Sequence, residues 1–302
     1  MEEGQMKKTK VLSVILCLTA LMNFTLADNI RGINMDFVNI GNAGNAGDTR
    51  DYYANPIGCG AVSYNYRIGK YEVTNAQFNA FTATAGVPTG NPSSAYDQSA
   101  SFTGAQQPAN NVSWYEAAQF CNYLTSGDKS KGAYQFSGSN AAPGNFLGID
   151  RVSSISTYGT TYVIPTEDEW YKAAYFKPDA SGYSLFANGT STAPINGVNS
   201  NYDSGAPWDI TNGTQEQNGT FNMMGNVWEW NEALPHGSSR GIRGDSYYYL
   251  DEYYLRSYDR DYVNPDGEYP NIGFRVAEIP EPASATIMTL GGLLFALKRR
   301  KR

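Results

Sequence analysis

The hexapeptide GNVWEW at residues 225–230 combines turn-forming residues with two tryptophans that flank a carboxylate. In an extended backbone Trp228 and Trp230 point to one side of the strand, and Glu229 points to the other. The indole side is therefore apolar, and the opposite side is available for binding. In the alternative interpretation, the tryptophans belong to the core and Glu229 merely faces water.

Oxygen atoms recur at alternate positions along the same stretch. Asn222 and Glu229 can contribute side-chain oxygens, and Gly225 and Val227 lie at the intervening positions of the series. Hard cations such as calcium are held by sets of oxygen ligands of this kind. The pattern therefore favours a cation site over residues 222–229.

Capping boxes predict three short amphipathic helices. In each box a Thr or Ser precedes Gln or Glu by three residues, and the boxes begin at Thr74, Ser113 and Thr166. The segment 66–73 alternates in part and contains a turn glycine, which predicts a strand pair. Long segments rich in Gly, Ser, Asn and Pro connect these elements. They cover residues 86–111, 126–161 and 179–219, and their recurrent aromatic residues predict packed loops.

Composition and charge exclude several classes of function. The chain has 22 basic and 29 acidic residues; its two ends hold eight basic and three acidic ones, so residues 28–279 carry 14 against 26. This acidity argues against a nucleic-acid partner. The single histidine, His236, excludes HExxH zinc sites and multi-histidine iron sites. Cys59 and Cys121 remain after the N-terminal segment, and the sequence leaves open whether they pair.

The N-terminus is predicted to be a signal peptide over residues 1–27. A basic segment at 6–10 precedes an apolar run at 11–26, and Thr25-Leu26-Ala27 offers the small residues that signal peptidase requires. Translation can start at Met1 or Met6. An N-terminal membrane anchor is the competing interpretation, although the apolar run is shorter than the ~20 residues a span needs.

The C-terminus carries a second targeting pattern, over residues 279–302. Pro280-Glu281-Pro282 precedes an apolar run at 285–297, which is predicted to be a short transmembrane segment, and the basic cluster 298–302 follows at once. This arrangement resembles the PEP-CTERM sorting signal of Gram-negative bacteria, which implies processing by an exosortase. A plain C-terminal tail anchor is the alternative. Both interpretations predict an exported domain, in the cell envelope or outside the cell.

Six ordered blocks of sequence carry a further resemblance. They resemble the formylglycine-generating enzyme or sulfatase-modifying factor family, and this implies a compact α+β domain over residues 28–278. The expected fold is C-type-lectin-like and loop-rich, with few short helices and small sheets. The blocks read YRIGKYEVTNAQFNAF (66–81), NNVSWYEAAQFCNYL (110–124), VIPTEDEWYKAAYF (163–176), FNMMGNVWEW (221–230), IRGDSYYY (242–249) and NIGFRVAE (271–278).

The resemblance implies calcium at two places. The family holds one ion with side chains and backbone carbonyls whose positions here are Asn222, Gly225, Val227 and Glu229. A second family site begins near an Asn-aromatic pair that corresponds to Asn201-Tyr202, although the loop that follows differs in length. Calcium is therefore the expected cofactor.

Catalysis is not expected to transfer from the family. The family forms formylglycine with a cysteine pair that binds copper, and thiolates suit Cu(I) because both partners are soft. The matching positions here are Tyr249 and Tyr254, so we do not expect copper. Trp228, Ser246 and Arg256 are retained, which predicts a ligand pocket without its reactive groups. The related sulfoxide synthases need several histidines for iron, and this chain has one.

Tyrosines dominate the region of the former active site. Eight of them lie between Tyr247 and Tyr269. Rigid rings with polar tips suit the recognition of sugars or peptides, although several of these rings could instead fill the core. The sequence thus predicts an exported, non-catalytic, calcium-stabilised binding or structural protein. The alternative is a family enzyme of divergent chemistry, an oxidoreductase acting on a protein or peptide.

Overall fold

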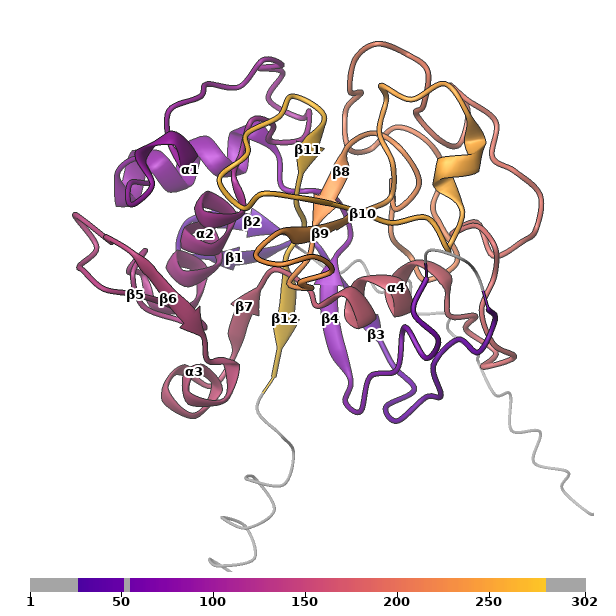
Figure 1. Ribbon diagram of the computed structural model, residues 1–302, viewed down its shortest axis with the longest axis horizontal. Helices are drawn as coiled ribbons and strands as arrows, with labels where there is room; N and C mark the ends of the chain where they lie inside the picture. Colours follow the sequence, from indigo (N-terminus) through magenta and orange to yellow (C-terminus); the bar gives the residue numbers. More distant parts are fainter. Residues whose placement is uncertain (1–26, 52–54, 281–302) are drawn as a thin grey trace, which may run out of the picture.

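The computed structural model describes residues 27–51 and 55–280 (Figure 1). Apart from their innermost residues, the predicted signal peptide (1–27) and sorting signal (279–302) lie outside the described residues, as does the apolar run 285–297. Among the described residues, no helix is long and apolar enough to cross a membrane.

The described chain contains short helices and short strands joined by long irregular segments, which confirms the predicted α+β class. The α-helices are α1 (Asn75–Ala85), α2 (Trp114–Ser126), α3 (Arg151–Tyr158) and α4 (Glu167–Tyr175), and the 3-10 helices are η1 (Ser93–Ala95) and η2 (Glu252–Leu255). The strands are β1 (Asp28–Ile30), β2 (Ile33–Met35), β3 (Phe37–Ile40), β4 (Tyr66–Gly69), β5 (Tyr134–Phe136), β6 (Phe146–Ile149), β7 (Thr161–Val163), β8 (Trp228–Trp230), β9 (Arg240–Arg243), β10 (Asp261–Val263), β11 (Ile272–Gly273) and β12 (Ala277–Ile279).

Two four-stranded sheets organise the described fold. Their strand orders are β10-β9-β8-β11 and β3-β4-β12-β7, and the hairpins β1-β2 and β5-β6 lie beside them. Strand β8, which contains the WEW sequence, is an inner strand, with Glu229 opposite Arg243 on β9 and Gly273 on β11. In Figure 1, α1 and α2 lie on one side of these sheets, and the loops that carry η2 lie on the other.

Local sequence signals explain three of the four helices. The side chains of Thr74, Ser113 and Thr166 each accept a hydrogen bond from the backbone N–H three residues later, which starts α1, α2 and α4 as predicted. In each box the Gln or Glu side chain accepts from the capping residue's own N–H, so two unpaired donors are satisfied. Helix α2 is buried over almost its whole length, so it anchors the core.

Two predictions about the connecting segments are wrong. Residues 66–73 do not form a strand pair: only Tyr66–Gly69 is a strand, β4, and it pairs with β3 and β12. Segment 126–161 is not only loop, because it contains β5, β6 and α3. The Asp150 side chain starts α3 by accepting a hydrogen bond from the Ser153 N–H (2.9 Å). The helix sequence RVSSISTY has too few apolar residues for a helical period to be visible.

Candidate functional site

Glu229 is buried and fully paired at the centre of the described domain. The Arg275 Nε and Nη2 atoms donate to its two carboxylate oxygens, each at 2.5 Å, and the Trp170 indole N–H donates at 2.7 Å. All three side chains are completely buried. The tryptophans of β8 are core residues, in accord with the alternative interpretation. The predictions that Glu229 faces water, or an open binding side, are both wrong because a guanidinium and an indole fill that side.

Asn222 is also engaged by protein groups. Its side-chain oxygen accepts from the Trp208 indole N–H at 3.0 Å, and its amide nitrogen donates to the Ile210 carbonyl at 3.1 Å. Calcium needs six to eight oxygen ligands. Because the only two side chains of the predicted set, Asn222 and Glu229, already hold protein donors, the residues as placed do not fit a calcium ion. Gly225 and Val227 lie buried between them.

The second predicted cation position lies beside the first. Asn201 pairs with Gly225 in a parallel bridge, and its carbonyl accepts from the Asn226 N–H at 2.7 Å. The Asn201 amide donates to the Asn226 side-chain oxygen at 3.1 Å, while the Tyr202 phenol donates to the Pro194 carbonyl at 3.3 Å. Asn201 therefore braces the 222–229 loop, and Tyr202 packs against the core.

Glu72 belongs to this network, although sequence reasoning missed it. Its carboxylate accepts from the side chains of Asn226 (2.8 Å) and Asn222 (3.3 Å). Burial raises the pKa of Glu72 to about 8, and the charge of Glu229 acts in the same direction. Burial likewise raises the pKa of Glu216 to about 7. In the sequence, Glu72 stands in a segment that resembles a strand, so its spacing gave no sign of this role.

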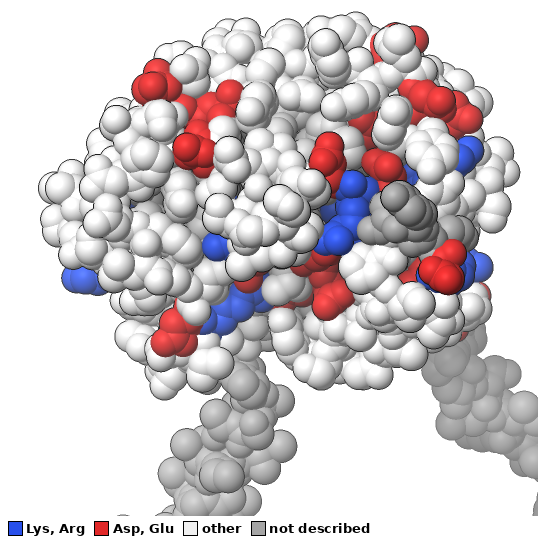
Figure 2. Space-filling model, viewed as in Figure 1, with Lys and Arg blue, Asp and Glu red and all other residues white. Residues whose placement is uncertain are grey.

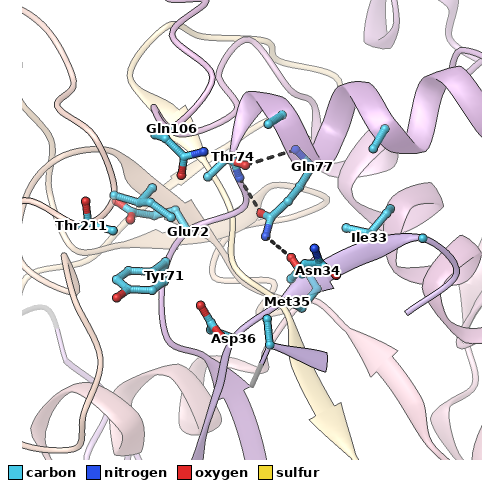
Figure 3. A pocket seen from close by; sticks show the side chains of 15 residues that line it. Ile33, Asn34, Met35, Asp36, Tyr71, Glu72, Thr74, Gln77, Gln106 and Thr211 are labelled. Atoms are coloured by element: carbon cyan, nitrogen blue, oxygen red, sulfur yellow. Dashed lines mark hydrogen bonds between the residues drawn. The ribbon is translucent and has the colours of Figure 1, made fainter. Parts of the chain in front are cut away.

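Glu72 also borders a hollow of about 430 Å³ (Figure 3). The hollow lies between β2, the segment 71–77 and the loops of Gln106 and Thr211. Its wall includes the capping box of α1, where the Gln77 side chain accepts from the Thr74 N–H (2.8 Å) and donates to the Asn34 carbonyl (2.7 Å). None of the site residues predicted from the sequence lines this hollow. Several polar groups of its wall thus have structural partners.

The residues of the predicted ligand pocket separate into a buried and an exposed group. Ser246 is fully buried, and its hydroxyl accepts from the Asn271 side-chain amide at 3.3 Å. Trp228 is buried as well, with its ring edge-on to Tyr249 at 6.1 Å. Tyr249 is half-buried, and Tyr254 is 38% exposed. Trp228, Tyr249 and Tyr254 therefore lie in one neighbourhood, while Ser246 lies in the interior.

Tyr249 and Tyr254 form a continuous surface with three of their neighbours in the sequence, here called the tyrosine patch. The patch consists of Tyr248, Tyr249, Leu250, Tyr253 and Tyr254. Tyr249 contacts the rings of Tyr248 and Tyr254, with centroid separations of 5.7 and 5.2 Å, and Tyr254 contacts Tyr253 at 5.7 Å. Tyr248 is 67% exposed and Leu250 is 75% exposed. Such rings hold one another in place, so the surface is ordered before any ligand binds.

Arg256 lies at the edge of the tyrosine patch. Its guanidinium stacks over the Tyr253 ring, 4.9 Å from the centroid, and donates to the Tyr258 phenol at 3.0 Å. Arg243 and Arg275 behave differently. Arg243 pairs with Glu167 at 2.7 Å and Arg275 pairs with Glu229, so both are structural.

Asp245 lies below the patch, and the sequence gave no sign that it would be unusual. It is fully buried, and neither carboxylate oxygen has a hydrogen-bond partner of normal geometry among the described residues. Burial raises its pKa to about 8, and the charges of Asp259 and Asp251 raise it further, while the neighbouring Ser246 N–H acts in the opposite direction. The residue also has a left-handed backbone, with φ of 64°. A buried carboxylate without a partner is costly for the folded state.

A model of the sulfatase-modifying factor enzyme 1-like domain matches residues 37–279. The chain belongs to this family. Sequence similarity to a curated relative is narrower: chaperone protein LppX of Paenibacillus barcinonensis is 30% identical over 113 residues, which span 36% of this chain and 36% of that protein.

Solved structures resemble the sulfatase-modifying factor-like domain over most of its length. Treponema denticola variable protein 1 matches with a TM-score of 0.61 and 22% identity, covering 85% of this chain and 98% of that one. CarF matches at 0.55 and 21%, covering 80% and 97%. PvdO from Pseudomonas aeruginosa matches at 0.57 and 17%, covering 81% and 94%. At these identities the likeness concerns the fold.

The two cysteines of the sulfatase-modifying factor-like domain are not bridged. Cys59 and Cys121 are both free and buried, which answers the question that the sequence left open. Burial raises the pKa of each thiol, so neither favours the thiolate that would bind copper. The Cys59 sulfur lies 3.9 Å from Arg243, whereas Cys121 lies on the buried helix α2.

Chelation provides a test of calcium in this sulfatase-modifying factor-like domain. Because Arg275 and Trp170 occupy the Glu229 carboxylate, we expect EDTA to leave the melting temperature of the purified domain unchanged. Differential scanning fluorimetry with EDTA, with calcium and with magnesium measures this. A lower melting temperature in EDTA that calcium alone restores would show that the loop binds the ion, as the family resemblance implies.

Proposed function

We propose that this chain is an exported, non-catalytic ligand-binding protein whose binding surface is the tyrosine patch. The observation that carries this proposal is the exposed, mutually packed set of rings at the place where the family has its reactive cysteines. Exposed clusters of apolar side chains on a folded domain are typical of interaction sites. The rings offer broad apolar faces together with phenol groups that can donate and accept hydrogen bonds.

The chemistry of the patch supports binding over catalysis. Burial raises the pKa of the Tyr249 phenol above its ordinary value, so the phenol stays protonated at neutral pH. A neutral phenol is a poor substitute for a thiolate as a ligand for a soft metal. The buried polar groups nearby, Ser246 and Arg243, are held by structural partners. The patch therefore offers contact area and hydrogen bonds, but no activated nucleophile.

Export is the part of the proposal that depends on the two ends of the sequence. The signal-peptide pattern implies signal peptidase as a processing partner, and the C-terminal pattern implies an exosortase. A domain delivered in this way would act in the envelope or in the extracellular material. A free binding surface is useful in either place.

Incubation with a sulfatase peptide tests the absence of catalysis. We expect no formylglycine when the purified domain is mixed with a Cys-x-Pro-x-Arg peptide, copper, oxygen and a thiol reductant, because no described cysteine lies in the patch. Mass spectrometry of the peptide is the readout, and a cysteine-containing formylglycine-generating enzyme serves as the positive control. Any formylglycine made by this chain would replace the binding proposal with the enzymatic one.

A further inference from the structure

Carboxylates surround the tyrosine patch on several sides. The Asp203 N–H donates to the Tyr249 carbonyl at 2.8 Å, which holds this exposed acid next to the patch. Asp251 begins η2 and is exposed, and Asp261 on β10 lies near enough to raise the pKa of the Tyr249 phenol. Figure 2 shows acidic side chains gathered over the part of this face where η2 lies. The exposed rings are thus bordered by negative charge.

The basic residues of the same segment offset this acidic border only in part. Arg260 is held by Glu167, with contacts of 2.8 and 2.5 Å. Arg243 is buried and paired with the same carboxylate. Arg256 stacks on Tyr253, donates to the Tyr258 phenol and forms no ion pair with a carboxylate among the described residues. Segment 245–261 has five acidic residues and two arginines, and one of these arginines is already committed to Glu167 outside the segment.

Two further carboxylates of the same segment are withdrawn from solvent: Asp245 is fully buried and Asp259 is half-buried. Neither oxygen of Asp245 has a hydrogen-bond partner of normal geometry among the described residues, and the charges that act on it, those of Asp259 and Asp251, are both negative. Burial raises the pKa of Asp259 to about 7, with Arg243 opposing and Asp261 reinforcing the shift. A cation bound above these groups would favour their charged forms. The base of the patch therefore also prefers a positively charged partner.

We infer that the tyrosine patch binds a cationic peptide segment, with arginine or lysine side chains lying on the ring faces and pairing with Asp203, Asp251 and Asp261. This inference rests on the proposed binding function and specifies its ligand class. A guanidinium is planar and weakly hydrated, so it stacks on tyrosine while its N–H groups reach carboxylates. A neutral glycan could stack on the rings and donate hydroxyl groups to the carboxylates, but it would leave their negative charge uncompensated.

Fluorescence anisotropy with a designed peptide tests the inference. The probe is a labelled peptide of repeated Gly-Ser-Arg, compared with matched Gly-Ser-Gln and Gly-Ser-Glu peptides. We expect the arginine peptide alone to bind. The triple variant Asp203→Asn, Asp251→Asn, Asp261→Asn should weaken binding by roughly tenfold or more, and raised salt should weaken it as well. Asparagine can retain the hydrogen bonds that Asp251 and Asp261 accept from the Tyr253 and Tyr262 N–H groups.

Matched variants show whether the loss of peptide binding is specific to the patch or follows from removing any exposed tyrosine or carboxylate. Tyr253→Ala with Tyr254→Ala should abolish binding, whereas Tyr158→Ala should not, although Tyr158 on α3 is 39% exposed and thus comparable to Tyr254. Asp179→Asn removes an exposed carboxylate elsewhere and should leave the affinity unchanged. Circular dichroism of each variant verifies that it is folded.

The outcomes distinguish this inference from the proposed function. If the arginine peptide fails to bind, or binds equally well to the triple variant, the cationic partner is wrong. If a glycan array then shows a ligand that is lost with Tyr253→Ala and Tyr254→Ala, the patch remains a binding surface with a neutral ligand. If arginine-peptide binding survives the two tyrosine changes, the patch is not the site.

Discussion

Arg275→Met is expected to lower the free energy of unfolding of this domain by about 3–5 kcal/mol. The change leaves the Glu229 carboxylate fully buried without its guanidinium, and it also removes the donors to the Gly69 and Phe221 carbonyls, which are at 2.9 and 3.0 Å. Loss of one partner of a buried ion pair costs about 3–5 kcal/mol. The free energy of unfolding of a domain is about 5–15 kcal/mol in total. Urea unfolding followed by circular dichroism should show a large decrease in the midpoint.

Arg67→Met is the matched control for this experiment. Arg67 pairs with Asp28 and Glu278, and its side chain is 34% exposed, so solvent can reach the charges that remain and its loss should cost less than the loss of Arg275. Replacing both partners, Glu229→Leu with Arg275→Met, should recover part of the stability because the Glu229 carboxylate is no longer left buried without its partner. Equal midpoints for Arg275→Met and Arg67→Met would contradict the central position given to Glu229.

Asp245→Gly is expected to stabilise the domain at alkaline pH. Asp245 is buried without a hydrogen-bond partner, and its backbone is left-handed, a conformation that glycine adopts without strain. Because the pKa of Asp245 is raised to about 8 in the folded state, the folded protein holds a proton that the unfolded chain has released. The stability contributed by this group is complete below about pH 4 and is lost as the pH rises through about 8.

The difference between the two proteins therefore grows with pH. We expect Asp245→Gly to differ little from the unsubstituted domain at about pH 5 and to be more stable by roughly 1–3 kcal/mol at about pH 9. The buried acids Glu72 and Glu216 also have raised pKa values, but they do not act on Asp245, so they are present in both proteins and cancel in the comparison. Asp179→Asn, at an exposed site, should show no such trend. A constant difference across this range would refute the assignment of a raised pKa to Asp245.

Local signals were sufficient for those parts of the fold that depend on neighbours in sequence. The boxes at Thr74, Ser113 and Thr166 start helices because the groups they join lie within one turn. Strand β4 was misread as a hairpin because its partners, β3 and β12, come from both sides of it in the sequence and one of them lies more than 200 residues away. Turn glycines carry no information about such distant pairing.

The residues of the candidate site divide in the same way, into those that local sequence identifies and those that only the whole fold defines. The residues Trp228, Tyr249 and Tyr254 were identified from the order of the sequence blocks, and the structure brings them together. The partner of Glu229 could not be identified because Arg275 is 46 residues away in the sequence, and no local pattern joins the two residues. Asp245 and Glu72 were missed for a similar reason: burial gives them their unusual properties, and burial is decided by the whole fold.

The strand order of the second sheet also constrains when folding can finish. Strand β12 is formed by residues 277–279 near the end of the domain, yet it lies between β4 and β7 as an inner strand. During synthesis, the earlier strands emerge from the ribosome with a gap where this strand belongs, and the guanidinium that neutralises Glu229 arrives at the same late stage. The nascent chain therefore cannot close this sheet until residues 277–279 have been made, and such late closure is compatible with the export proposed above.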